Sequence, residues 1–261
     1  MPWSQPTSRL VGVLHLPPLP GAPRHSAGLQ AVLDRALADA EALAEGGAGA
    51  CIVENLGDAP FAPTVEPHVT AMLAVVAREV RQRFGDRLQV GVNALRNDAQ
   101  AALGAAAAAE AQFVRINVHI GAMVTDQGVI EGRARDTLLY RQRLNPDLGL
   151  VTDVLVKHAA PLGDWRLEDA ARDTWHRGGA DVLVVSGSGT GRPTDPDDVR
   201  RVREAVPEAT IWLGSGMTPE RVDALSPLLD AAIVGTWLHR DGRLDQPLDV
   251  DRVRSMASAL G

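Results

Sequence analysis

Short apolar runs alternate with stretches of helical periodicity eight times along the chain, and this alternation constrains the fold more than any other feature of the sequence. The runs are rich in Val and Ile, as expected of strands that are buried on both faces of a parallel sheet. Strand-helix alternation of this kind predicts parallel strands joined by right-handed crossovers. The predicted strands are 10–14, 50–53, 89–92, 113–118, 150–156, 182–185, 210–213 and 231–234.

Helical spacing of apolar residues follows each predicted strand. The predicted helices are 28–45, 64–84, 98–109, 132–144, 167–177, 196–205, 219–225 and 250–260. Eight such units in 261 residues predict a single (β/α)8 TIM barrel, a fold of about 250 residues. A doubly wound open sheet is the alternative, but the even number of units favours closure. No linker divides the chain, so 1–261 is predicted to be one domain, with 1–8 as a loose N-terminal segment.

Composition narrows the classes of partner. The net charge of −7 and the scarcity of aromatic residues argue against a nucleic-acid-binding surface. Cys51 is the only cysteine, which excludes an internal disulfide, and its apolar neighbours predict a buried and inert thiol. The N-terminus does not resemble a signal peptide, and no apolar run approaches the ~20 residues that span a bilayer. We therefore expect a cytoplasmic protein without membrane insertion, and formation of a homo-oligomer stays open.

The last three predicted strands each end in glycine together with Ser or Thr. Glycine lets backbone N–H groups approach an anion, and a helix N-terminus adds further donors and a favourable dipole. A single glycine exit usually just makes a tight turn, but three in succession favour a phosphate-binding cup after strands six to eight, where barrels often bind phosphate. The residues of the predicted cup are Ser186, Gly187, Ser188, Gly189, Gly214, Ser215, Gly216, Gly235 and Thr236.

Polar residues lie at the C-terminal ends of the other predicted strands, which is where the active sites of such barrels are found. In the run 113–119, Arg115, Asn117 and His119 alternate with Val and Ile, so the three polar side chains are predicted to share the inward face. A satisfied polar network in the core is the alternative. The candidate catalytic residues are Glu54, Asn93, Arg115, Asn117, Asp153 and Lys157.

Alternation repeats in the fifth predicted strand, where Asp153, Leu155 and Lys157 share a face. Asp153 is predicted to pair with Arg115 on the neighbouring strand. Lys157 has three possible roles: to bind an anion, to stabilise developing negative charge, or to form a Schiff base. We favour an electrostatic role because the sequence alone shows no desolvation of this amine. Glu54 is the best candidate for a general base, with a helix cap or a salt bridge as the alternative.

Histidines and one acidic residue near the strand ends are predicted to contact substrate, although a loop histidine is more often structural. These residues are His15, His119, Asp126 and His158. No H-E-x-x-H or other metal-binding spacing is present. No cofactor is predicted, and a divalent metal held by Glu54, Asp58 and His119 stays open. The long loops 16–27 and 119–131 are predicted to be lids or substrate readers.

Seven motifs together resemble the BtpA/SgcQ family over the chain from about residue 9 to the C-terminus. They are HLPPLPG at 15–21, VENLGDAPF at 53–61, GVNALRND at 91–98, FVRIN at 113–117, TDQGVIEG at 125–132, DVLVKH at 153–158 and LGSG at 213–216. The family is named for a cyanobacterial factor that affects photosystem I accumulation, and its members are similar to phosphate-binding barrels. Many occur beside sugar or nucleoside genes. The resemblance implies that the polar positions above form one shared site, although His239 stands where a lysine is expected.

Two functions follow from these patterns. The first is an enzyme that binds a phosphorylated pentose or a nucleoside-like compound and acts as a lyase, glycosidase or isomerase. The second is a non-catalytic assembly factor for a membrane protein complex. Inward-facing charges disfavour the second function, because burying charge is costly and a scaffold has no need of it.

Overall fold

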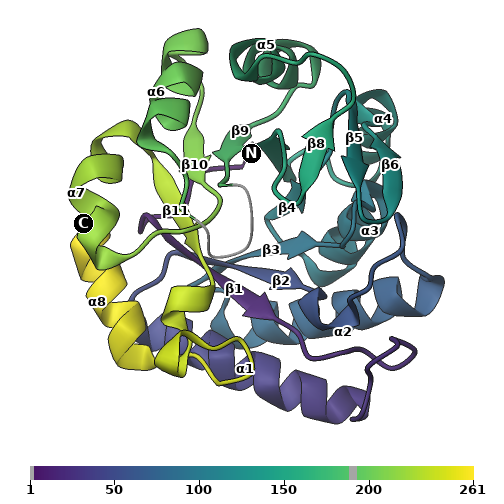
Figure 1. Ribbon diagram of the computed structural model, residues 1–261. Coiled ribbons are helices and arrows are strands. Elements are labelled where there is room, and N and C mark those ends of the chain that lie inside the picture. Colours follow the sequence, from purple (N-terminus) through teal and green to yellow (C-terminus); the bar gives the residue numbers. More distant parts are fainter. Residues whose placement is uncertain (1–2, 188–192) are drawn as a thin grey trace.

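Eight parallel strands form a closed barrel surrounded by helices (Figure 1). The structure, a computed structural model, describes residues 3–187 and 193–261. The barrel strands are hydrogen-bonded in the order β1-β11-β10-β9-β7-β4-β3-β2. This closed ring confirms the predicted (β/α)8 architecture and excludes the open sheet. The strands are β1 (Leu10–His15), β2 (Ala50–Glu54), β3 (Gln89–Asn93), β4 (Phe113–Ile116), β7 (Gly149–Val154), β9 (Val182–Val185), β10 (Ile211–Leu213) and β11 (Ala231–Val234).

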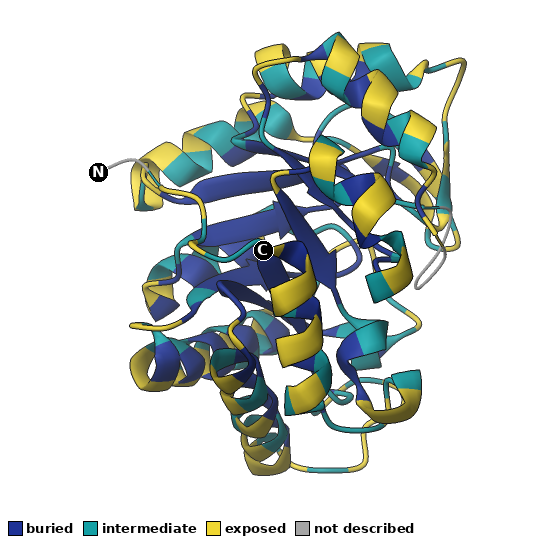
Figure 2. Ribbon diagram, turned by 90° about the vertical axis from the view of Figure 1, so that its left-hand side faces the viewer, coloured by how far each residue is buried: buried dark blue, intermediate teal, exposed yellow. Residues whose placement is uncertain are grey.

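Amphipathic helices pack their apolar faces on the outside of the barrel, so that buried strands lie within a layer of half-exposed helices (Figure 2). The helices are α1 (Leu29–Gly46), α2 (Pro67–Phe84), α3 (Ala99–Ala109), α4 (Ala134–Leu144), α5 (Leu167–Arg172), α6 (Pro196–Ala205), α7 (Val222–Leu225) and α8 (Val250–Leu260). Aspartates 98, 195 and 249 cap the N-termini of α3, α6 and α8 through their carboxylates. In the described ranges, no helix has the length and apolar character needed to cross a bilayer.

The interior of the barrel is apolar at the N-terminal ends of the strands, a region that we call the floor. It consists of Val11, Val13, Ala50, Ile52, Phe113, Val151, Val182, Val184, Trp212, Ala231 and Ile233. Gly91 leaves room for Phe113, because a Cβ at Gly91 would lie 2.2 Å from the Phe113 ring. Trp3 packs against this cluster, with its ring centroid 5.4 Å from that of Phe113, and its Nε1 donates to Gln89 Oε1 at 2.8 Å. The start of the described chain is therefore held on the barrel rather than loose.

A three-stranded antiparallel sheet occupies most of the segment that the sequence predicts to be the loop 119–131. It contains β5 (Ala122–Thr125), β6 (Gly128–Glu131) and β8 (Ala159–Pro161). Met123 and Ile130 are paired across β5 and β6 and are buried, whereas the next pair, Val124 and Val129, is exposed. The prediction of an irregular loop is wrong here. Any movement of this hairpin on ligand binding stays a prediction.

Two strands end earlier than predicted, and the reason is the same sheet. β4 stops at Ile116 and β7 at Val154, because Val118 and Val156 pack with the hairpin instead of continuing the barrel. The chain then turns at Leu155, whose backbone φ of 53° lies in the left-handed region. Inward and outward alternation therefore does not extend beyond Asn117 and Val154.

Candidate functional site

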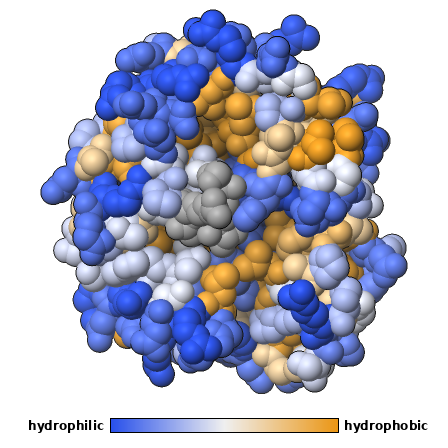
Figure 3. All heavy atoms as spheres, in the orientation of Figure 1, coloured by the Kyte–Doolittle hydropathy of each residue, from blue (hydrophilic) through white to orange (hydrophobic). Residues whose placement is uncertain are grey.

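Two adjoining cavities open at the C-terminal ends of the barrel strands, and four side chains line both of them. The first, which we call the cup cavity, has a volume of about 230 Å³ and lies beside the exits of β10 and β11. The second, the wall cavity, has a volume of about 420 Å³ and lies beside β2, β3, β4 and the hairpin. The shared residues are His15, Glu54, Arg115 and Lys157. Figure 3 shows apolar side chains above and below the centre of the face seen in Figure 1, with mostly hydrophilic ones on its rim.

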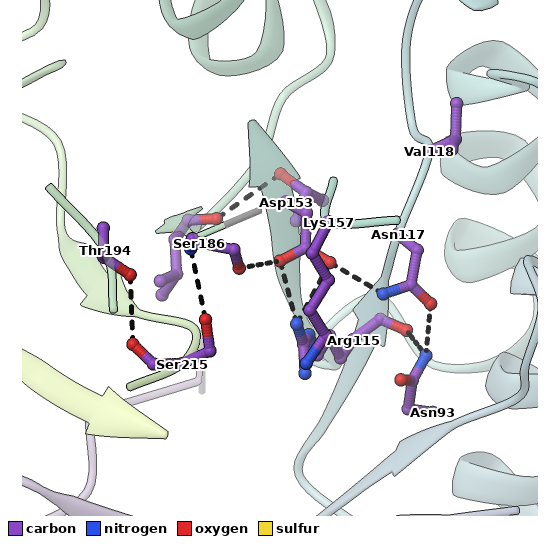
Figure 4. Close-up of polar contacts among 12 residues, drawn as sticks. Asn93, Arg115, Asn117, Val118, Asp153, Lys157, Ser186, Thr194 and Ser215 are labelled. Atoms are coloured by element: carbon purple, nitrogen blue, oxygen red, sulfur yellow. Dashed lines mark hydrogen bonds and ion pairs between the residues drawn. The ribbon is translucent and has the colours of Figure 1, made fainter. Parts of the chain in front are cut away.

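The Arg115–Asp153 pair is the centre of a buried polar network (Figure 4). Arg115 Nη2 donates to Asp153 Oδ1 and Oδ2, at 3.0 and 3.2 Å, which confirms the pairing predicted from the sequence. Asn117 Nδ2 donates to Asp153 Oδ2 at 2.7 Å, and Ser186 Oγ donates to Oδ1 at 3.4 Å. Burial alone lowers the pKa of Arg115, but the Asp153 and Glu54 carboxylates outweigh it and hold the pKa above its ordinary value. The guanidinium is therefore a fixed positive charge.

Glu54 ends β2 between a cation and a histidine without a tight contact to either. Its Oε2 lies 3.9 Å from Arg115 Nη1, and its Oε1 lies 3.8 Å from His15 Nε2. Both distances exceed hydrogen-bonding range, so the carboxylate keeps its capacity to accept from a ligand. This placement fits the general-base role predicted for Glu54, which stays a prediction.

Lys157 is the only lysine in the sequence, and it lines both cavities together with Arg115. Its ammonium group has no hydrogen-bond or ion-pair partner among the residues that the structure describes. Burial and then the neighbouring Arg115 lower the pKa of Lys157, although Glu54 and Asp153 act in the opposite direction. The desolvation that the sequence could not reveal is thus present, which gives the Schiff-base alternative a physical basis beside the electrostatic role.

Asn93 contacts residues that line the wall cavity but does not line the cavity itself. Its Nδ2 donates to the Arg115 carbonyl at 3.0 Å and to Asn117 Oδ1 at 3.1 Å. Asn117 lines the wall cavity, whereas Asn93 lines neither the cup cavity nor the wall cavity. Asn93 therefore positions the chain around Arg115 and Asn117.

The candidate substrate contacts divide into two groups. His15, Asp126 and His158 line the wall cavity, and Asp126 reaches it from the turn between β5 and β6. His119 does not, because β4 has ended at Ile116, and its Nε2 instead donates to the Gly178 carbonyl at 2.8 Å. The prediction that His119 shares the inward face with Arg115 is therefore wrong.

The carboxylates and histidines considered for a metal do not converge. Asp58 accepts from the Leu19 amide at 2.8 Å and from Asn55 at 3.0 Å, away from Glu54 and His119. Within residues 3–187 and 193–261, no three His, Cys, Asp or Glu side chains are grouped so as to hold a metal ion. Cys51 is buried in the main hydrophobic core, and burial raises the pKa of its thiol to about 12.

The cup cavity is lined by two of the three glycine-rich exits. The residues on it are Gly214, Ser215, Gly216, Gly235 and Thr236. Ser186 faces Asp153 instead, the Gly187 amide donates to Ser215 Oγ at 3.1 Å, and Ser188 and Gly189 lie outside the described residues.

Close packing explains two of these glycines. A Cβ at Gly214 would lie 2.1 Å from Ser186 Oγ, and one at Gly235 would lie 2.5 Å from His15 Cε1. Close packing therefore favours glycine at both positions whether or not an anion binds. Phosphate binding by the cup therefore stays a prediction.

Two buried residues of the site were not predicted from the sequence. Arg96, in the connection between β3 and α3, lines the wall cavity and donates from Nη2 to the Lys157 carbonyl at 2.7 Å. His239, after β11, has no exposed surface, and its Nε2 lies 3.3 Å from Nδ1 of His15. A charged residue directly after the mostly apolar run 89–95 was the available signal for Arg96. Nothing in the sequence places His239 beside His15.

Solved structures with the same fold come from several enzyme classes. The chain matches orotidine monophosphate decarboxylase of Leishmania donovani with a TM-score of 0.60 and 18% identity, over 97% of this chain and 92% of that one. It matches thiamine phosphate pyrophosphorylase of Pyrococcus furiosus with a TM-score of 0.60 and 13% identity, over 97% and 95%. At these identities the likeness shows the TIM-barrel fold alone.

Sequence relatives cover nearly the whole chain, and the BtpA family model matches residues 7–261. An uncharacterized protein of Thermococcus kodakarensis is 43% identical over 95% of this chain and 93% of its own length. The photosystem I biogenesis protein BtpA of Synechocystis is 40% identical over 96% and 87%, and the putative sgc region protein SgcQ of Escherichia coli is 30% identical over 94% and 91%. These matches show that the chain belongs to the BtpA family.

Proposed function

We propose that this protein is a metabolic enzyme that binds a phosphorylated sugar or a nucleoside-like compound across the two cavities. The phosphate occupies the cup cavity beside Gly214–Gly216 and Thr236, and the reacting carbons extend into the wall cavity. The observation that carries the proposal is that the two cavities share one polar wall, made of His15, Glu54, Arg115 and Lys157. Remote binding of the phosphate then positions the reacting end against that wall.

The wall supplies the groups that acid-base chemistry on a sugar needs. Glu54 accepts or returns a proton, and Arg115, which Asp153 holds in place, balances negative charge that develops on the substrate. Asn117 and Asp126 offer hydrogen bonds to hydroxyl groups at the far end of the wall cavity. General acid-base chemistry with such groups is compatible with a lyase, a glycosidase or an isomerase.

The names of fold neighbours support a phosphorylated ligand. They include thiamine phosphate pyrophosphorylase and phosphoribosyl anthranilate isomerase, each of which is named for a phosphorylated compound. Buried charge in the mouth adds to this support, because Arg115 and Asp153 are almost inaccessible to solvent and costly to bury without a function.

The test of the cup is a pair of variants at Thr236, which lines the cup cavity and is only half-buried. Thr236→Asp places a negative charge where the phosphate is proposed to bind, and Thr236→Asn is its neutral control of nearly equal shape. We expect calorimetry to show that Thr236→Asp lowers the affinity for inorganic phosphate by at least about tenfold, since like charges repel at short range. Thr236→Asn should stay within about threefold of the unaltered protein. Equal affinities in the two variants would place the phosphate elsewhere.

The test of the chemistry begins with mass spectrometry of any ligand that the purified protein retains. Trapping with borohydride then separates the two roles of Lys157. Because Lys157 is the only lysine, a sugar-phosphate adduct that is lost in Lys157→Met identifies a Schiff base without ambiguity from other side chains. Full activity without a trapped adduct supports the electrostatic role.

An assembly factor is the second candidate, and one surface favours it. Val124, Val129 and Leu162 expose 44%, 52% and 55% of their surface on and beside the three-stranded sheet. A relative that is 40% identical is named as a photosystem I biogenesis protein. The test is complementation of a deletion strain by variants of the gene. If the double variant Val124→Ser/Val129→Ser fails to restore the phenotype while Glu54→Gln restores it, the assembly function is correct and the enzymatic one is not.

A further inference from the structure

Two histidines and a carboxylate form a chain that runs from the outer loop after β11 to the centre of the mouth. His239 Nδ1 lies 2.7 Å from the Gln246 carbonyl, and His239 Nε2 lies 3.3 Å from His15 Nδ1. The two rings are stacked, with centroids 5.6 Å apart and planes 18° apart. At the inner end, His15 Nε2 lies 3.8 Å from Glu54 Oε1.

These contacts determine which ring nitrogens carry hydrogen. A carbonyl oxygen only accepts, so the short contact to Gln246 requires hydrogen on Nδ1 of His239. In neutral His239, Nε2 is then an acceptor, and the facing Nδ1 of His15 has to be the donor. Neutral His15 with hydrogen on Nδ1 has a bare Nε2, and this nitrogen is the one that faces Glu54 and the cavities.

The surroundings keep both rings neutral. Cations face His15 from several elements: Arg115 on β4, Lys157 after β7 and Arg35 on α1, while Glu54 is the acidic group beside it. Burial, followed by His239 and these cations, lowers the pKa of His15. Burial also lowers the pKa of His239, despite its bond to the Gln246 carbonyl.

We propose that His239 is a positioning residue that fixes His15 as its Nδ1–H tautomer, so that Nε2 of His15 and Oε1 of Glu54 together accept hydrogen bonds from hydroxyl groups of a ligand. Two acceptors that face each other at 3.8 Å leave a place for a donor between them, and His15 itself has no hydrogen to offer there. His15 lines both cavities and packs against Gly235, so the acceptor pair stands where a sugar joins its phosphate. The choice of a sugar hydroxyl as donor rests on the function proposed above, but the tautomer does not.

The tautomer is measurable without a ligand. In ¹⁵N-labelled protein at pH 7.5, long-range ¹H–¹⁵N correlation spectra distinguish protonated from bare ring nitrogens, and the His15 signals are assigned by their loss in His15→Asn. We expect His15 with hydrogen on Nδ1 and a bare Nε2, and His239 with hydrogen on Nδ1. Hydrogen on Nε2 of His15 in the unaltered protein would overturn the proposal.

Two variants test whether His239 is the cause. His239→Leu removes the acceptor, so the His15 spectrum should shift to the form with hydrogen on Nε2, which can then donate to Glu54. His239→Gln keeps a side-chain acceptor and should retain the original spectrum. An unchanged spectrum in His239→Leu would show that another group fixes His15.

Calorimetry connects the tautomer to binding. In His239→Leu we expect the affinity for D-ribose 5-phosphate to fall about five- to tenfold, as one lost hydrogen bond implies, while that for inorganic phosphate stays within about twofold. An equal loss for both probes would contradict the acceptor role of His15. If the unaltered protein binds neither probe, the proposed function fails, and the spectra still decide the tautomer.

Discussion

The floor and the mouth of this barrel are built by the same strands, two residues apart, yet their chemistry is opposite. On β4, Phe113 belongs to the floor and Arg115 to the mouth. On β2, Ile52 and Glu54 have the same relation. Inward-facing positions recur every two residues along a strand. Two successive inward positions on one strand thus differ in being apolar and charged.

This difference distinguishes the residues that stabilise the fold from the residues that form the candidate site. Floor residues stabilise the barrel by filling its interior, and any apolar set of the right volume serves that purpose. The mouth charges are costly to bury, and Lys157 is not compensated by an acidic partner within 4 Å in the described residues. Substitutions two residues apart on one strand should therefore act on different properties of the protein.

The largest effect is expected on β2, from Glu54→Gln. The amide keeps the shape of the side chain but cannot take a proton, so turnover of the substrate should fall about 100- to 10,000-fold. Ligand affinity should stay within several-fold, because the change acts on the transition state. Steady-state kinetics with the ligand identified by mass spectrometry measures both quantities.

Ile52→Val is the matched control, two residues earlier on the same strand and in the floor. It should lower the free energy of unfolding by about 0.5–1.5 kcal/mol and leave turnover unchanged. Near-normal turnover in Glu54→Gln would make Glu54 a structural partner of Arg115. A Glu54→Gln protein that fails to fold would lead to the same conclusion.

A smaller effect, on stability, is expected from Arg115→Met. The substitution leaves the Asp153 carboxylate buried without its cation, so the free energy of unfolding should fall by about 3–5 kcal/mol. Urea denaturation measures this loss, and an unchanged m-value would show that the unfolded state is unaffected. A loss below about 1 kcal/mol would mean that Asn117 and Ser186 alone satisfy Asp153, and that the ion pair is dispensable for folding.

The sequence predicted the barrel and part of the mouth, because both follow from local periodicity. Alternation in 113–117 correctly placed Arg115 and Asn117 inside, and the parity of Asp153 on the next barrel strand correctly paired it with Arg115. The rule failed where the strands end. Lys157 reaches the mouth through the left-handed turn at Leu155, not through strand alternation, and His119 turns away to Gly178.

Contacts between distant segments were beyond prediction from periodicity. The hairpin of β5 and β6 is stabilised by Val118 and Val156, which lie outside it, so its own sequence resembles a loop. His15 and His239 are 224 residues apart and meet only because β1 is the neighbour of β11 in the closed barrel. The contact between His15 and His239, and the burial that lowers the pKa of Lys157, are therefore visible only in the folded structure.

The smallest effect is expected from the other cation of the mouth, Lys157. Its pKa in the folded protein lies below 10.5, the ordinary value that applies in the unfolded chain. Between these two values the unfolded chain binds more protons, so the stability of the folded protein rises with pH across this window. Below the window, both states carry the charge and the burial penalty is complete.

Lys157→Met removes that penalty, so its effect on the free energy of unfolding should be opposite to that of Arg115→Met. At pH 7 the variant should equal or exceed the unaltered protein in stability by up to about 1 kcal/mol, and the difference should disappear as the pH approaches 10.5. Urea denaturation between pH 7 and 10.5 measures the difference.

Reductive ¹³C-methylation gives the pKa directly, since only Lys157 and the N-terminal amine react. A variant that is less stable by more than about 1 kcal/mol at pH 7 would mean that Lys157, like Arg115, is held by the carboxylates around it, and that both cations of the mouth contribute to the fold.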